Sequence, residues 1–261
     1  MGAGGSAMTP ALELRNVQRR FGRTEVVRGA SLAVKPGERV ALIGPNGAGK
    51  STLFNLISGQ LAPDAGEILL NGQAIQGLPP YEIVRRGLAR SFQTSQLFAR
   101  LSTVENLRCA LLHSEGAGYA FWRPARRRGL DERAEALLAM LRLEHRRDVP
   151  AAQLAYAEQR ALEIGLTIAG GAGIVLLDEP TAGMSREETA WFVALIRRAT
   201  EGRTLLVVEH DMSVVFELAD RIAVLVDGEV VAFDTPAAVR ADARVQQAYL
   251  GALPAAGEGA C

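Results

Sequence analysis

The segment from Gly44 to Thr52 combines residue types at a spacing that suits phosphate binding. Gly44 to Ser51 fits the pattern G-x-x-x-x-G-K-[ST]. Glycines let the backbone wrap around a phosphate with its N–H groups pointing inward, and a following helix N-terminus adds positive potential. Lys50 would neutralise the β- and γ-phosphates, and the Ser51 hydroxyl would bind Mg²⁺. The residues predicted to surround the phosphates are Gly44, Pro45, Asn46, Gly47, Ala48, Gly49, Lys50, Ser51 and Thr52.

The alternative interpretation of this segment is a glycine-rich turn with an incidental lysine. It is disfavoured because Lys35 is the only other lysine in the chain and all the remaining basic residues are arginines or histidines. The apolar run Val40–Ile43 leads directly into the loop, and a helix through Leu53, Leu56 and Ile57 is expected after it. This strand–loop–helix context is what a phosphate loop requires.

Two adjacent carboxylates follow a second apolar run, Ile174–Leu177. Asp178 is placed to hold Mg²⁺ through water, and Glu179, one residue farther, could accept a proton from an attacking water or orient it. Most Asp-Glu pairs simply end a strand, and only the combination with the phosphate loop favours the catalytic interpretation. Together the two motifs predict nucleotide hydrolysis, with ATP and Mg²⁺ as the bound species.

Composition is that of an ordinary globular protein. Of the 261 residues 48% are hydrophobic and 22% charged, which excludes collagen-like, coiled-coil and largely disordered chains. The 29 Lys and Arg residues balance 29 Asp and Glu residues, so no whole-molecule field favours nucleic acid. No apolar run is long enough to span a bilayer, and the N-terminus lacks the pattern of a secretory signal. Cys109 and Cys261 lack C-x-x-C spacing, so a reduced, cytosolic compartment is expected.

Short apolar strands that alternate with helical patterns predict an α/β fold with a parallel sheet. The parallel strands expected are Val40–Ile43, Ile174–Leu177 and Thr204–Val208, whereas Leu12–Val17 and Glu25–Val34 alternate like strands of an antiparallel region. Local signals add a helix capped by Ser185 and Glu188, a helix opened by Thr235-Pro236, and a hairpin at Asp227-Gly228.

Taken together with three further segments, these motifs resemble the ATP-binding subunit of ABC transporters. The resemblance implies that Gln93 is the glutamine that contacts Mg²⁺ and water and senses the membrane partner. It implies that His210, in Glu209-His210-Asp211, hydrogen-bonds the γ-phosphate, and that Phe21 stacks on adenine. The alternative interpretation of His210 is a structural histidine after a strand, and that of Phe21 is a core or edge-strand phenylalanine.

The resemblance also implies the domain organisation. It predicts a P-loop NTPase with a RecA-like core at about 11–92 and 168–251, an antiparallel β subdomain, and an inserted helical subdomain at about 93–167. These make one ATP-binding domain over 11–251, between flexible tails at 1–10 and 252–261.

Within that family the chain resembles the branch that takes up branched-chain amino acids and urea. The resemblance rests on residues 78–80, 89–93, 178–184, 209–212 and 248–251. It implies a non-identical second ATP-binding subunit, two membrane-spanning permease subunits, an indirect solute-binding protein, and a peripheral place on the cytoplasmic face of the membrane. Alternatives are a lipopolysaccharide-type export ATPase and a nucleotide-binding regulator with weak hydrolysis. One cassette without a heptad run argues against a soluble family member acting in DNA repair or on ribosomes.

The family's signature, commonly L-S-G-G-Q, departs from that form here. The residues expected to reach the nucleotide on the opposite subunit are Ala155, Tyr156, Ala157 and Glu158. Ala155 lacks the serine hydroxyl, a donor worth about 1.5–3 kcal/mol to a charged acceptor. The Cβ of Ala157 could hold the backbone N–H away from phosphate. Two hypotheses stay open: the substitutions weaken one of two ATP sites, or alanine is tolerated.

Overall fold

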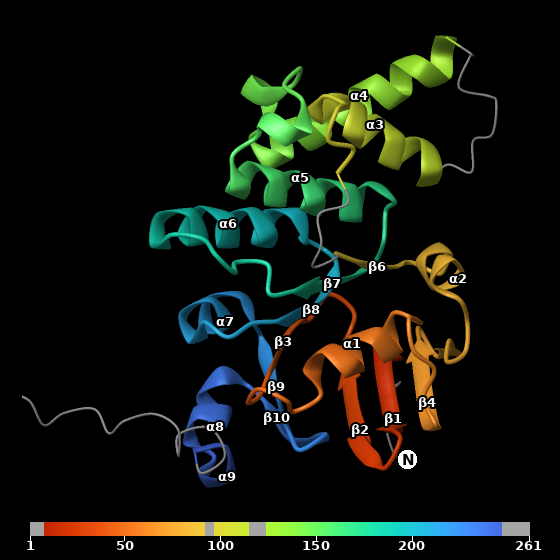
Figure 1. Ribbon diagram of the computed structural model, residues 1–261, viewed down its shortest axis with the longest axis vertical. Helices are drawn as coiled ribbons and strands as arrows, with labels where there is room; N and C mark the ends of the chain where they lie inside the picture. The colour runs from red at the N-terminus through yellow and green to blue at the C-terminus, as the bar shows by residue number, and fades with distance from the viewer. Residues whose placement is uncertain (1–7, 92–96, 115–123, 247–261) are drawn as a thin grey trace, which may run out of the picture. The chain divides into compact units, whose positions relative to one another are not determined.

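The computed structural model describes residues 8–91, 97–114 and 124–246 (Figure 1). Gln93 lies outside the described residues. The chain forms two compact units, one made of residues 1–80 with 208–261 and the other of residues 81–207. No helix in the described part of the chain is long and apolar enough to cross a membrane.

The first unit contains an antiparallel sheet with strand order β2-β1-β4-β5. Residue Leu12 of the central strand pairs with Val34 on one side and with Leu70 on the other. Apolar side chains on one face of β1 and β2 are buried and their neighbours are exposed or half-buried, as the alternating sequence predicts. The strands are β1 (Leu12–Phe21), β2 (Thr24–Val34), β4 (Ala65–Leu70) and β5 (Gln73–Ala74).

The same unit holds the strand that leads into the phosphate loop. β3 (Arg39–Ile43) runs parallel to β9 (Arg221–Val226), which forms a hairpin with β10 (Glu229–Asp234). The hairpin turn at Asp227-Gly228 has positive φ at both residues, 47° and 84°, which confirms the predicted tight turn. The helices of the unit are α1 (Lys50–Ile57), α7 (Met212–Leu218), α8 (Pro236–Ala241) and α9 (Ala243–Val245).

The second unit contains three strands in the order β8-β7-β6. β7 (Ile174–Asp178) is buried along its whole length and pairs in parallel with β6 (Leu88–Arg90); β8 (Thr204–Val208) is likewise buried. Such continuous burial suits parallel strands covered on both faces. α6 (Arg186–Ala199) begins where predicted, with the Ser185 side chain accepting from the Glu188 amide at 3.3 Å. α2 (Pro80–Arg85) precedes β6.

Three packed helices make up the rest of the second unit: α3 (Thr103–Ser114), α4 (Pro124–Leu141) and α5 (Tyr156–Ala169) (Figure 1). Gly165 allows their close approach, because a Cβ there would lie 2.5 Å from Leu141 Cδ1. Two short 3-10 helices, η2 (Glu144–Arg146) and η3 (Ala151–Gln153), connect α4 to α5.

Candidate functional site

The phosphate loop connects β3 to α1 and leaves the first turn of α1 without a side-chain cap. Its N-cap is Gly49, which has φ 101° and no side-chain oxygen, and the first turn contains no acidic residue. The first N–H groups of a helix have no partner within the helix and attract anions. The N-terminus of α1 therefore suits phosphate.

Two loop glycines are fixed by close backbone contacts within the first unit. A Cβ on Gly44 would lie 2.1 Å from the Leu225 carbonyl oxygen, and one on Gly49 would lie 2.7 Å from that of Val26. Gly47, by contrast, has φ 81° with nothing within 4 Å of the Cβ position. The two glycines of the pattern, Gly44 and Gly49, are therefore needed for packing, whereas Gly47 is favoured by its backbone conformation alone.

Lys50 is buried at the start of α1, with only 7% of its surface exposed. Its Nζ donates to the Gly44 carbonyl at 2.7 Å and to the Pro45 carbonyl at 2.9 Å. Buried lysines are uncommon because desolvation of the ammonium costs energy unless polar atoms surround it. The loop therefore holds this cation against its own backbone carbonyls.

Phe21 ends β1 and is 45% exposed, which is inconsistent with a core role. The Arg19 guanidinium lies 5.0 Å from the centroid of the Phe21 ring.

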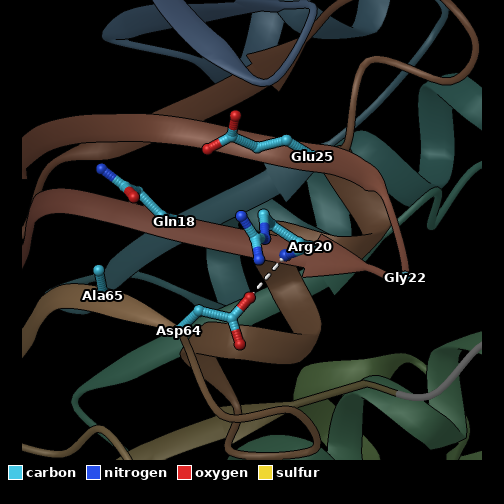
Figure 2. A pocket seen from close by; sticks show the side chains of 6 residues that line it. All are labelled: Gln18, Arg20, Gly22, Glu25, Asp64 and Ala65. Carbon is cyan, nitrogen blue, oxygen red and sulfur yellow. Dashed lines mark hydrogen bonds between the residues drawn. The ribbon is translucent and has the colours of Figure 1, made fainter.

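A hollow of about 390 Å³ lies next to Phe21 in the chain. It is lined by Gln18, Arg20, Gly22, Glu25, Asp64 and Ala65 (Figure 2). The Arg20 amide closes one edge of this hollow by donating to the Asp64 carboxylate at 2.7 Å. The hollow is polar, and sequence reasoning did not single out its residues.

His210 follows β8 and is exposed. Its backbone N–H donates to the carboxylate of buried Glu209 at 3.2 Å. The next residue, Asp211, caps α7 by accepting from the Ser213 amide at 2.8 Å. An exposed histidine held between a strand end and a capped helix can reach a ligand, whereas a core histidine could not.

Asp178 ends β7 in the second unit and is paired with an arginine. Arg90 Nη2 lies 3.0 Å from Asp178 Oδ2, and the two side chains are 9% and 1% exposed. Burial lowers the pKa of Arg90, and the Asp178 carboxylate offsets part of that change. Arg90 lies within the segment 89–93 that carries the family resemblance, but no local pattern shows that two strand ends 88 residues apart in the chain meet.

Glu179 has a left-handed backbone, with φ 46°. This conformation is uncommon for a residue other than glycine and persists only where the surroundings enforce it, often at functional sites. The Glu179 carbonyl accepts the Ala182 amide at 3.1 Å, so the residue opens a turn immediately after β7. The side chain predicted to work on water thus projects from a constrained turn.

The signature segment forms the N-terminus of α5, and its own glutamate closes that end. The Ala155 amide donates to Glu158 Oε2 at 2.9 Å, and Arg146 Nε donates to Glu158 Oε1 at 2.8 Å. Burial opposes ionisation of Glu158, but the hydrogen bonds from Arg146 and Ala155 outweigh it and hold its pKa below the usual range. Ala157 is buried at this end.

The predicted residues therefore fall into two groups. Phe21, the phosphate loop and His210 belong to the first unit, while Asp178, Glu179 and the signature segment belong to the second. Contacts that sequence reasoning missed join members of the second group to Arg90, Arg146 and Ala182.

Known proteins resemble the chain in sequence along most of its length. The family model for ABC transporters matches residues 27–182, and that for branched-chain amino acid ATP-binding cassette transporters matches residues 229–252. The chain is 39% identical to the high-affinity branched-chain amino acid transport ATP-binding protein BraF of Pseudomonas aeruginosa, with 93% of this chain and 98% of the relative covered. It is 38% identical to LivG of Escherichia coli K12, which has the same description and the same coverage.

Solved structures agree with these matches. A nucleotide-free ATP-binding cassette from an ABC transporter has TM-score 0.78 and 27% identity, with 92% of this chain and 98% of that one covered. An ABC transporter cassette in its ADP conformation has TM-score 0.78 and 26% identity, with 93% and 99% covered. The predicted P-loop NTPase fold and nucleotide binding are thereby confirmed, and the chain belongs to the ABC transporter family as an ATP-binding, ATP-hydrolysing subunit.

Proposed function

We propose that this ATPase powers the import of branched-chain amino acids, urea or a similar small polar solute. The observation that carries the proposal is the match of residues 229–252 to the branched-chain amino acid cassette model, which lies outside the part matched by the general family model. The names of the two relatives support the same solute class. A lipopolysaccharide-type export ATPase and a regulator with weak hydrolysis are the alternatives.

The phosphates of ATP would lie on the loop from Gly44 to Thr52, with adenine on Phe21. Lys50 would neutralise the β- and γ-phosphates, and His210 would hydrogen-bond the γ-phosphate. Support comes from the uncapped N-terminus of α1 and from the buried position of Lys50.

Ser51 and Asp178 would hold Mg²⁺, together with Gln93. A hydroxyl, a carboxylate and an amide are the hard oxygen ligands that suit this ion. When bound, Mg²⁺ neutralises charge on the phosphates. Glu179 would accept a proton from the attacking water, or orient it, from its constrained turn, a role worth about 10²–10⁴-fold in rate.

The partners we propose are a non-identical second ATP-binding subunit, two permease subunits and, indirectly, a solute-binding protein. The chain would sit on the cytoplasmic face of the membrane, with no nucleic acid bound. A core at about 11–92 and 168–251, with a helical insertion at about 93–167, is the proposed domain organisation.

The signature of this chain would make one of the two ATP sites weaker. Ala155 and Ala157 lack groups that would favour phosphate, and Glu158 already accepts the Ala155 amide. Restoring glycine at Ala157 in the assembled transporter should raise the ATPase rate. An unchanged rate would mean that alanine is tolerated.

The function is tested with the transporter reconstituted in vesicles together with its permeases, second ATPase subunit and binding protein. ATP-dependent uptake of labelled leucine should occur and should be lost in Glu179→Gln, which keeps the size of the side chain but removes its basicity. Uptake of another solute would change the solute class. Absence of ATP hydrolysis in the full assembly would favour the regulator.

A further inference from the structure

Tyr156, which follows Ala155 in the signature segment, contacts the segment that follows Glu179. The Glu179–Ser185 segment connects β7 to α6, and α5 begins at Tyr156 (Figure 1). The Tyr156 hydroxyl donates to the Ala182 carbonyl at 2.9 Å. A Cβ on Gly183 would lie 3.7 Å from the tyrosine ring, so the ring also packs against this segment.

The hydroxyl of Tyr156 is itself held from the other side. Arg160 Nε donates to it at 3.0 Å, and the guanidinium lies 5.3 Å from the ring centroid. Arg160 in turn pairs with Glu163 at 3.0 Å, where both side chains are less than 20% exposed. Tyr156 is therefore fixed on the first turns of α5, although its residue surface is 45% exposed.

Two hydrogen bonds lead from Tyr156 to the backbone of Glu179. The first is the bond to the Ala182 carbonyl, and the second runs from the Ala182 amide to the Glu179 carbonyl at 3.1 Å. Glu179 needs such restraint because its φ of 46° is disfavoured for a residue with a side chain. β7 fixes the turn at its start, and Tyr156 fixes it at its end.

We propose that Tyr156 is a positioning residue for Glu179, which ties the N-terminus of α5 to the turn bearing the hydrolytic carboxylate of the same chain. This inference rests on the proposed role of Glu179. Its consequence is that a displacement of the signature segment, when a partner subunit docks on it, is transmitted to Glu179 through Ala182.

Tyr156→Phe tests the proposal because it removes only the hydroxyl and keeps the ring. In the complete transporter we expect kcat for ATP hydrolysis to fall about three- to tenfold, the effect of one neutral hydrogen bond, with KM for ATP within about twofold of wild type. Hydrogen exchange at the Ala182 amide should accelerate. Arg160→Met, which leaves the hydroxyl in place, should lower kcat less than Tyr156→Phe does.

The matched control is Tyr81→Phe. Tyr81 is also an exposed tyrosine of the second unit with an arginine over its ring, and its hydroxyl donates to the neighbouring Glu82 at 3.4 Å. It should leave kcat and the exchange at Ala182 unchanged. An equal fall of kcat in both variants would overturn the proposal, because the loss would then not depend on Ala182.

Two further outcomes overturn it. They are an unchanged kcat in Tyr156→Phe, whether or not KM for ATP rises, and a loss of kcat without faster exchange at Ala182. Failure of the proposed function would give a different result from failure of the Tyr156 proposal. If the proposed function is wrong, the wild-type transporter lacks ATP hydrolysis or Glu179→Gln retains it.

Discussion

The N-termini of α1 and α5 are built in opposite ways. α1 has Gly49 as its N-cap, with no side-chain cap and no acidic residue in its first turn. α5 has Ala155 as its N-cap, and Glu158 in its first turn accepts the Ala155 amide and pairs with Arg146. One helix end offers its N–H groups and positive potential to an outside anion, whereas the other already holds an anion of its own chain.

The phosphate loop and the signature segment have the same proposed ligand, the phosphates of ATP. The difference between their helix N-termini shows that they need not bind it equally well. A carboxylate at a helix N-terminus stabilises the helix, and it also repels an incoming phosphate. The N-terminus of α1 is thus suited to an outside anion, whereas that of α5 is stabilised by its own glutamate.

The largest effect is expected from Lys50→Met. It removes the buried cation of the phosphate loop, a charge-assisted contact whose loss should weaken ATP binding roughly 10- to 100-fold. Lys35→Met is the matched control, since Lys35 is the only other lysine in the chain. Equilibrium binding of a fluorescent ATP analogue measures the affinity of each variant. Equal affinities of the two variants would contradict the proposed role of Lys50 in ATP binding.

Gly49→Ala should destabilise the protein by about 1–3 kcal/mol, because the new Cβ would meet the Val26 carbonyl at a residue with positive φ. Gly47→Ala should cost only about 1 kcal/mol, since it brings the strain of positive φ without a contact. Urea unfolding of the two variants measures the difference. A larger loss in Gly47→Ala would mean that the close approach at the start of α1 is unimportant.

Glu158→Gln should raise the ATPase rate of the assembled transporter about two- to fivefold, by removing an anion from the N-terminus of α5. Glu188→Gln is the control, because Glu188 accepts the Ser185 amide at 2.8 Å in the same position of α6, outside the signature segment. It should leave the rate unchanged. Equal rates in all three proteins would show that the charge of Glu158 does not oppose the partner's nucleotide.

The smallest effect is on the pH dependence of stability. Because the folded state lowers the pKa of Glu158, its contribution is complete above the ordinary value of 4.5 and is lost as the pH falls through the folded-state value. At pH 7 the free energy of unfolding of the wild-type protein should be about 0.3–1 kcal/mol larger than that of Glu158→Gln. The difference should shrink below pH 4.5, and a constant difference down to pH 3 would contradict it.

Local patterns predicted the elements well where a strand or helix carries its own signal. The alternation in β1 and β2, the Ser185 cap of α6 and the hairpin at Asp227-Gly228 depend on neighbours in the sequence, and all are as expected. Contacts between distant segments carry no such signal. The pairing of Arg90 with Asp178 and of Tyr156 with Ala182 depends on which segments pack together.

The sequence by itself determined the strand–loop–helix junction formed by β3 and α1, because the glycines and Lys50 within it have the spacing that predicts backbone binding of phosphate. It also placed Asp178 and Glu179 at a strand end. Only the tertiary structure decided that the α5 N-terminus is closed by Glu158 and Arg146, and that Glu179 opens a turn joined to Tyr156. Those properties arise from hydrogen bonds and charges between segments, whose distances are fixed only when the chain is packed.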